Sequence, residues 1–145
     1  MIAVKYPEPD FKMKTEKGRQ YVFDAIRKVW LLLTEEEWVR QNFVNYLIAR
    51  LNYPSTVIAI EKEISLNDLK KRFDILVYNK EHKPWMLIEC KAPDVTLDNA
   101  VLDQVLRYNI SVPVPLIVIT NGNTTYGWEK QEGGLKELEL LPSWA

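Results

Sequence analysis

The stretch that decides the fold reads Arg72-Phe73-Asp74-Ile75-Leu76-Val77-Tyr78 and, after a short polar turn, Trp85-Met86-Leu87-Ile88-Glu89-Cys90-Lys91. Both runs are apolar and of strand length, yet each carries a carboxylate, and the second closes with a glutamate and a lysine two residues apart. Burying an unpaired charge is costly, so apolar strands rarely hold charged residues without a reason. The pattern therefore predicts a β-hairpin on which Asp74, Glu89 and Lys91 meet and have a chemical role.

The geometry of this hairpin follows from the alternation of side chains along a strand. Glu89 and Lys91 share one face, and Cys90 points to the other. A two-residue loop at Glu81-His82 places Asp74 directly opposite Glu89, with Cβ atoms about 5 Å apart. The loop lacks the Asn-Gly or Asp-Gly pair of common tight turns, so a longer loop that shifts the register by one residue is the alternative.

These three side chains suit a divalent-metal site that hydrolyses a phosphodiester. Mg²⁺ takes oxygen ligands, often one or two carboxylates with waters and a substrate phosphate. A bound metal polarises the phosphate and acidifies a water, while a nearby lysine can orient or deprotonate that water or neutralise charge on the phosphate. Acid-x-Lys triplets also start at Asp10, Asp68 and Glu81, where we assign no role. A strand end with solvated charges is therefore an equal alternative on spacing alone.

Length and composition indicate one folded domain. The chain has 145 residues, of which 47% are hydrophobic and 11% aromatic, enough for a core of its own. The single cysteine excludes a disulfide framework and a cysteine zinc cluster, and fits a reducing compartment. No apolar run reaches the roughly 20 residues of a membrane span, and the N-terminus lacks a signal-peptide core. We expect a soluble cytoplasmic protein with no membrane contact.

The net charge of −1 gives no global signal for nucleic acid. Basic residues nevertheless gather in two places: Lys12, Lys14, Lys17 and Arg19 near the N-terminus, and Lys70, Lys71 and Arg72 directly before the Asp74 strand. Beside a metal site such a cluster could follow a phosphate backbone. A solvated charged face is the alternative.

The chain divides into a polar N-terminal arm, residues 1–18, and a single domain, residues 19–145. Residues 21–33 are apolar without a clean period, so helix and strand both remain open. Thr34 and the three glutamates after it predict a helix with Thr34 as its N-cap, running to about Leu51.

The remaining elements are expected at 56–64 (strand leading into the hairpin), 97–108 (helix), 116–120 (buried strand) and 125–129 (strand). A last apolar segment after Gly133-Gly134 forms an edge strand or a surface tail. In the 97–108 helix, Gln104 falls on the stripe that should face the sheet. A buried amide needs partners, so Gln104 bonds a strand end or orders metal-bound water or phosphate.

The order helix, three-strand meander, helix, strand, with Asp74 on the second strand and Glu89-x-Lys91 on the third, resembles the PD-(D/E)xK nuclease superfamily. It looks most like the N-terminal domain of type I restriction enzyme R subunits, as found alone in small bacterial proteins. The matching segments are Glu36–Gln41, Arg72–Ile75, Ile88–Pro93, Gln104–Asn109 and Thr120–Gly122, which together cover roughly residues 20–125.

This resemblance implies an α/β (α+β) restriction-endonuclease-like core, a mixed β-sheet flanked by helices in the order α-β-β-β-α-β. It also implies cleavage of DNA that depends on weakly bound Mg²⁺ or Mn²⁺. Asp74, Glu89 and the backbone carbonyl of Cys90 would hold the metal, and Lys91 would be the catalytic lysine. The other implied or expected site residues are Gln104 and Glu36 as catalytic groups and Lys70, Lys71, Arg72, Arg40 and Tyr108 as DNA contacts.

Two residues depart from the family pattern. Phe73 replaces the proline of the superfamily name, and Glu35 stands where a proline often precedes the acids. R subunits also drive cleavage with a translocating ATPase, which this sequence does not contain, so a motor or modification subunit is a candidate partner.

The leading hypothesis is therefore a metal-dependent deoxyribonuclease. A non-catalytic DNA- or subunit-binding module on the same fold is the second, and a plain interaction domain the third. The oligomeric state stays open, with a dimer among the alternatives.

Overall fold

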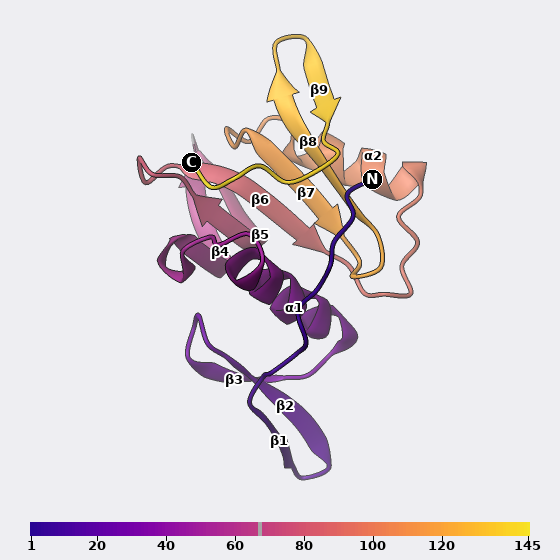
Figure 1. Cartoon of the computed structure of the whole chain (residues 1–145). Coiled ribbons are helices and arrows are strands. Elements are labelled where there is room, and N and C mark those ends of the chain that lie inside the picture. Colours follow the sequence, from indigo (N-terminus) through magenta and orange to yellow (C-terminus); the bar gives the residue numbers. More distant parts are fainter. Residues whose placement is uncertain (67) are drawn as a thin grey trace.

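The computed structural model describes residues 1–66 and 68–145, which form two β-sheets and two α-helices (Figure 1). The larger sheet holds β4 (Ile58–Leu66), β5 (Leu69–Tyr78), β6 (Pro84–Cys90), β7 (Leu116–Thr120), β8 (Thr125–Gln131) and β9 (Gly134–Glu137) in that spatial order. The smaller sheet holds β1 (Met13–Glu16), β2 (Arg19–Asp24) and β3 (Val29–Leu32). The helices are α1 (Glu35–Ala49) and α2 (Asn99–Asn109), and a 3₁₀ turn covers Ser55–Val57.

The N-terminal part of the chain forms the small antiparallel sheet. The segment 21–33, which the sequence left open between helix and strand, supplies parts of β2 and β3. The expected arm, residues 1–18, contains β1 and is joined to the large sheet, because the Ile2 N–H donates to the Thr125 carbonyl at 2.8 Å. The Lys17-Gly18 turn has positive φ at both residues, 51° and 76°, a conformation that glycine adopts freely.

Helix α1 begins where the sequence predicts. The Thr34 side chain accepts the N–H of Glu37 at 3.0 Å, which confirms Thr34 as the N-cap. The helix ends at Ala49, two residues before the predicted Leu51. Figure 1 shows α1 between the large sheet and the β1–β3 sheet, so the helix can carry contacts to both.

The large sheet is covered on both faces (Figure 1). On one face Phe43 of α1 packs in a cluster with Ile75 and Ile88 of the sheet. On the other, Val105 of α2 packs with Ile119. Strands β4, β5 and β6 form an antiparallel meander, and β7 returns parallel to β6 after α2. The predicted mixed sheet flanked by helices, in the order α-β-β-β-α-β, is therefore confirmed by α1-β4-β5-β6-α2-β7.

The C-terminal part of the sheet also follows the sequence. All residues of β7 are buried, as its unbroken β-branched character predicts. Strand β8 extends the large sheet, and β9 forms its edge beyond β8, so the last apolar segment starts as an edge strand. Among the described residues, none of the helices is long and apolar enough to cross a membrane.

The β5–β6 hairpin has the predicted register but a different loop. Ile75 pairs with Ile88 and Val77 with Met86, the register expected for Asp74 opposite Glu89. The two-residue loop at Glu81-His82 is wrong, because the strands end at Tyr78 and resume at Pro84. An irregularity between Val77 and Tyr78 shifts the pairing by one residue near the turn and compensates for the longer loop.

Candidate active site

The hairpin places its two carboxylates next to each other. The pairing of the two strands ends at Ile75 with Ile88, directly before Asp74 and Glu89, and the side chains of these two acids contact each other. The neighbouring strand β6 holds the Asp74 carboxylate, because the Cys90 N–H donates to Asp74 Oδ2 at 2.8 Å. This bond leaves Oδ1 as the oxygen that other groups can reach.

Asp74 lies at a break in the strand's alternation. Phe73 and Leu76 pack in the same cluster, while Ile75 packs on the α1 face, so the side chains do not alternate regularly through Asp74. In the described part of the β4–β5 ladder the pairs on either side are formed but Glu61 and Asp74 are not paired, and Glu61 has φ of 49°. This irregularity turns the Asp74 carboxylate toward α1, which the sequence pattern did not indicate.

Burial and the neighbouring acid change the protonation of Glu89. Desolvation is the largest cause and the charge of Asp74 the next, and together with a contact to the Asp74 side chain they raise the pKa of Glu89 to about 7. Lys91 acts in the opposite direction but does not offset them. At neutral pH the Glu89 carboxyl is therefore partly protonated, and a bound cation would favour its ionised form.

Glu89 and Lys91 open onto a cavity beside α2. The cavity has a volume of about 250 Å³, and its lining includes Glu89, Lys91 and Gln104. Cys90 instead packs in the α1-side core, which confirms the predicted alternation of these three strand residues. Among the described side chains, Lys91 forms no ion pair within 4 Å, so its amine is available to a ligand in the cavity.

Gln104 reaches this cavity from an exposed position. The sequence placed Gln104 on the buried stripe of its helix, and this is wrong: the buried residues of α2 are Leu102, Val105 and Asn109. Gln104 sits at the margin of that stripe, where an amide can meet both solvent and a ligand. It lies together with Glu89 and Lys91, as expected for a site residue.

Glu36, in the first turn of α1, lies near the same charges. Burial raises its pKa first and the charge of Asp74 raises it further, while Arg40 and Lys91 lower it. The charges of Asp74 and Lys91 therefore act on Glu36, although Glu36 is not part of the cavity lining. The structure brings Asp74 and Glu89 into contact, and Glu89, Lys91 and Gln104 line one cavity.

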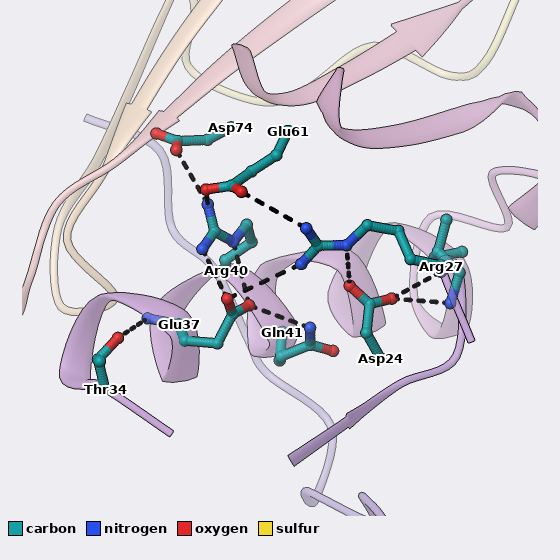
Figure 2. Close-up of polar contacts among 9 residues, drawn as sticks. Asp24, Arg27, Thr34, Glu37, Arg40, Gln41, Glu61 and Asp74 are labelled. Carbon is teal, nitrogen blue, oxygen red and sulfur yellow. Dashed lines mark hydrogen bonds and ion pairs between the residues drawn. The ribbon is translucent and has the colours of Figure 1, made fainter. Parts of the chain in front are cut away.

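Arg40, expected as a DNA contact, occupies a different place (Figure 2). Its guanidinium binds Glu37 at 2.6 Å, Glu61 at 2.9 Å and Asp74 at 3.1 Å. Burial alone would lower the pKa of Arg40, but bonding to Glu37 and the charges of Glu61 and Asp74 raise it. Only 6% of the residue is exposed, so it has no free side for a phosphate and the expectation is corrected.

The ion-pair cluster continues from Arg40 into the small sheet (Figure 2). Arg27, in the β2–β3 turn, bonds Asp24 at 2.7 Å and lies 3.8 Å from Glu37 and 3.5 Å from Glu61. Asp24 is fully buried and also accepts the N–H groups of two turn residues. Sequence reasoning missed these residues. Asp24 closes an apolar run much as Glu89 does, and that is the signal that could have revealed it.

Two of the other expected DNA contacts, Lys71 and Tyr108, lie beside the cavity. Lys71 stacks on Tyr108, with its ammonium 3.6 Å from the ring centroid, and donates to the Tyr108 carbonyl. Desolvation lowers the pKa of Lys71, and Glu89 counteracts this, which places Lys71 near the carboxylates. Tyr108 is 67% exposed, and Lys70 and Arg72 are exposed on β5. Lys71 and Tyr108 thus place a cation and an aromatic ring at one edge of the cavity.

The donor set fits a hard divalent cation held by few side chains. Among the described residues, no three His, Cys, Asp or Glu side chains gather closely enough to bind a metal by themselves. Asp74 and Glu89 are nevertheless adjacent acids, and after desolvation the charge of Asp74 is the next cause that raises the pKa of Glu89. Mg²⁺ is commonly bound by one or two carboxylates with waters and substrate oxygens. Two carboxylates and a backbone carbonyl match that preference and fit a weak site.

One comparison with known proteins identifies a family for this chain. A sequence model of the family described as Type I restriction enzyme R protein N terminus (HSDR_N) matches residues 35–142, which leaves β1, β2 and β3 outside the match. No curated protein matches the chain. A crystal structure of a DUF820 protein from Anabaena variabilis ATCC 29413, described as a candidate nuclease, aligns with a TM-score of 0.49 and 11% identity over 92% of this chain and 79% of that one.

Proposed function

The chain belongs to the family of type I restriction enzyme R protein N-terminal domains, and from this premise we propose that it is a Mg²⁺-dependent deoxyribonuclease that hydrolyses phosphodiester bonds. Mn²⁺ would serve in place of Mg²⁺. The observation that carries the proposal is the adjacency of Asp74 and Glu89 beside a cavity that also presents the Lys91 amine.

The metal would be held by Asp74, Glu89 and the carbonyl of Cys90, and when bound it would acidify a water and polarise the scissile phosphate. Asp74 is preset for this role, because the Cys90 N–H fixes one of its oxygens. Glu89 must lose its proton first, and its pKa of about 7 makes that loss easy near neutral pH.

The remaining residues act on the water and the phosphate. Lys91 would orient or deprotonate the attacking water, or neutralise charge on the phosphate, from its place in the cavity wall. The Gln104 amide would position the same water or a phosphate oxygen. Glu36 would bind a metal-coordinated water, since its charge interacts with both Asp74 and Lys91.

DNA would approach along the margin of the cavity. Lys71 and Tyr108 flank the carboxylates with a cation and an exposed ring. The exposed Lys70 and Arg72 lie on the same strand as Asp74 and extend the positive charge. We propose that these four residues hold the DNA backbone in the cytoplasm, alone or with a motor or modification subunit, as a monomer or a dimer.

The test is a cleavage assay on supercoiled and single-stranded DNA with millimolar Mg²⁺ or Mn²⁺. We expect the wild-type chain to nick or degrade DNA, and Lys91→Ala and Asp74→Ala to lose that activity by at least a hundredfold, because each removes a group of the reaction. Lys83→Ala, in the exposed β5–β6 turn, is the matched control. Undiminished cleavage in both site variants would show that the assigned site is wrong.

A second candidate function is a non-catalytic module that binds DNA or a subunit. One observation favours it: Arg40 already neutralises Asp74 at 3.1 Å and could replace the metal at that carboxylate. Such a module would bind DNA without metal, with affinity that falls steeply as salt rises. DNA binding that is unchanged by chelator, together with an absence of cleavage, would favour this function.

A further inference from the structure

Charge is unevenly distributed along this chain. Residues 11–33, which form the β1–β3 sheet and its turns, hold six of the 19 basic residues and only two of the 20 acidic ones. One of those two acids, Asp24, is fully buried and paired with Arg27. The small sheet is therefore a positive body on a chain whose remainder is acidic, and it lies outside the part matched by the family.

One face of this sheet gathers aromatic and basic side chains. Directly opposed residues of neighbouring antiparallel strands point to the same face. Lys14 opposes Tyr21, Tyr21 opposes Leu32, and Phe23 opposes Trp30. These five residues, together with Lys12, form what we call the aromatic face.

The aromatic face is turned toward solvent. Trp30 is 40% and Leu32 44% exposed, and Lys14, Tyr21 and Phe23 are half-buried. On the opposite face Val22 and Asp24 of the central strand are fully buried, although Met13 and Val29 on the outer strands are exposed. Val22 and Asp24 therefore mark the side of the sheet that packs on the body of the protein. Figure 1 shows this sheet projecting beyond α1, away from the large sheet.

The lysines lie over the rings. The Lys14 ammonium is 4.7 Å from the Trp30 ring centroid and 5.8 Å from that of Tyr21, and the Lys12 ammonium is 5.6 Å from Phe23. Trp30 and Phe23 meet edge to face at 5.2 Å, which orients both rings. Lys14 also pairs with the exposed Glu16 at 3.2 Å, an ion pair that a phosphate would have to displace. Aromatic rings with cations beside them are the two components of surfaces that bind single-stranded nucleic acid: the ring stacks a base, and the cation binds the adjacent phosphate.

We propose that the aromatic face binds single-stranded DNA, with bases stacked on Trp30 and Tyr21 and phosphates bound by Lys12 and Lys14. The choice of DNA rests on the proposed function. Unpaired bases are required because a duplex hides the faces that would stack. Three strands spaced about 4.8 Å apart offer room for two or three bases.

A chain of ion pairs runs from the small sheet, where the DNA strand would bind, to the candidate active site. The path runs from Asp24 to Arg27 (2.7 Å), to Glu37 (3.8 Å), to Arg40 (2.6 Å) and to Asp74 (3.1 Å). These ion pairs link the β2–β3 turn, α1 and β5 (Figure 2). The sheet would therefore hold DNA at a fixed position relative to the site rather than on a loose arm.

Fluorescence anisotropy of a labelled oligothymidine measures this binding with metal removed by chelator, so that cleavage does not interfere. We expect wild-type affinity for the oligonucleotide to exceed that for a blunt duplex of equal length. Trp30→Ala should weaken binding about tenfold or more, and Trp30→Phe should recover most of it, because both rings stack. Lys14→Gln should reduce the salt dependence by about one counterion, whereas Lys83→Gln should change nothing.

Three outcomes would overturn the inference: equal affinity for duplex and single strand, unchanged binding in folded Trp30→Ala, or equal competition by polyglutamate. The first two would show that no base is stacked, and the third that the face binds any polyanion. Circular dichroism confirms that Trp30→Ala is folded. The nuclease proposal can fail separately: oligonucleotide binding without cleavage leaves this inference intact, and cleavage by a Trp30-independent route leaves the nuclease intact.

Discussion

Replacing Arg40 by methionine tests whether the ion-pair cluster holds the candidate site together. The side chain keeps a similar length, but three carboxylates then lose their shared cation: Glu37, Glu61 and Asp74. Removing one partner of a buried ion pair costs about 3–5 kcal/mol. Glu61 is 39% exposed at its side chain and can rehydrate, so we expect Arg40→Met to lie at the low end, about 3 kcal/mol less stable.

Urea unfolding followed by tryptophan fluorescence measures this difference at neutral pH. Arg40→Lys keeps a charge but loses the forked geometry, and should fall between the wild type and Arg40→Met. Arg50→Met, at the exposed end of α1, is the matched control, with an expected change within about 0.5 kcal/mol. A loss below about 1 kcal/mol in Arg40→Met would refute the argument that this cation is required by the three carboxylates.

Three further changes test other parts of the structure. The pKa of Glu89 is raised in the folded chain to about 7, so the metal-free protein should lose stability as pH rises from about 4.5 through 7, and Glu89→Gln should remove that loss in urea titrations at pH 5 and pH 8. Thr34→Ala removes the N-cap of α1 and should destabilise the protein by about 1 kcal/mol, whereas Thr34→Ser should keep the cap. Equal melting temperatures for the wild type and both variants would contradict this role of Thr34. A Cβ at Gly127 would lie 2.9 Å from Ile2 Cδ1, the movable end of a flexible side chain, so Gly127→Ala should destabilise only at the low end of overpacking, by about 1 kcal/mol, and adding Ile2→Val should recover that loss in the same melts.

The register of the hairpin could be predicted, but for a partly wrong reason. The sequence showed two apolar runs, each with one acid, and the pairing that brings the acids together is the observed one. The predicted two-residue loop at Glu81-His82 does not form. The longer loop keeps the same register because the pairing shifts by one residue between Val77 and Tyr78. Packing of both strand faces, rather than turn chemistry, fixes the pairing here.

The Gln104 prediction was wrong because two stripes compete on one short helix. Val101, Gln104, Val105 and Tyr108 follow a helical period, and so do Leu102, Val105 and Asn109, rotated by about one residue. The second stripe packs on the sheet, and within it the Asn109 amide N–H donates to the Val105 carbonyl of the helix while its Oδ1 is buried without a partner. A single sequence holds no information that would choose between them.

The role of Arg40 could not be predicted for a different reason. A charged residue on a helix is usually solvated, and the partners that bury this one come from distant segments. Glu61 is itself a strand residue with positive φ, and this conformation brings it near Arg40. Arg27, which also pairs with Glu61, lies in the turn of a sheet that the sequence left undecided. These are tertiary contacts between segments with no local signal for each other.

A calorimetric titration with Mn²⁺ and Mg²⁺ tests most directly whether Asp74 and Glu89 form a metal site. We expect a saturable binding event in the wild-type chain at millimolar metal, which disappears in Glu89→Gln and in Asp74→Asn and persists in Lys83→Ala. An absence of heat in the wild type, or unchanged binding in both carboxylate variants, would contradict it.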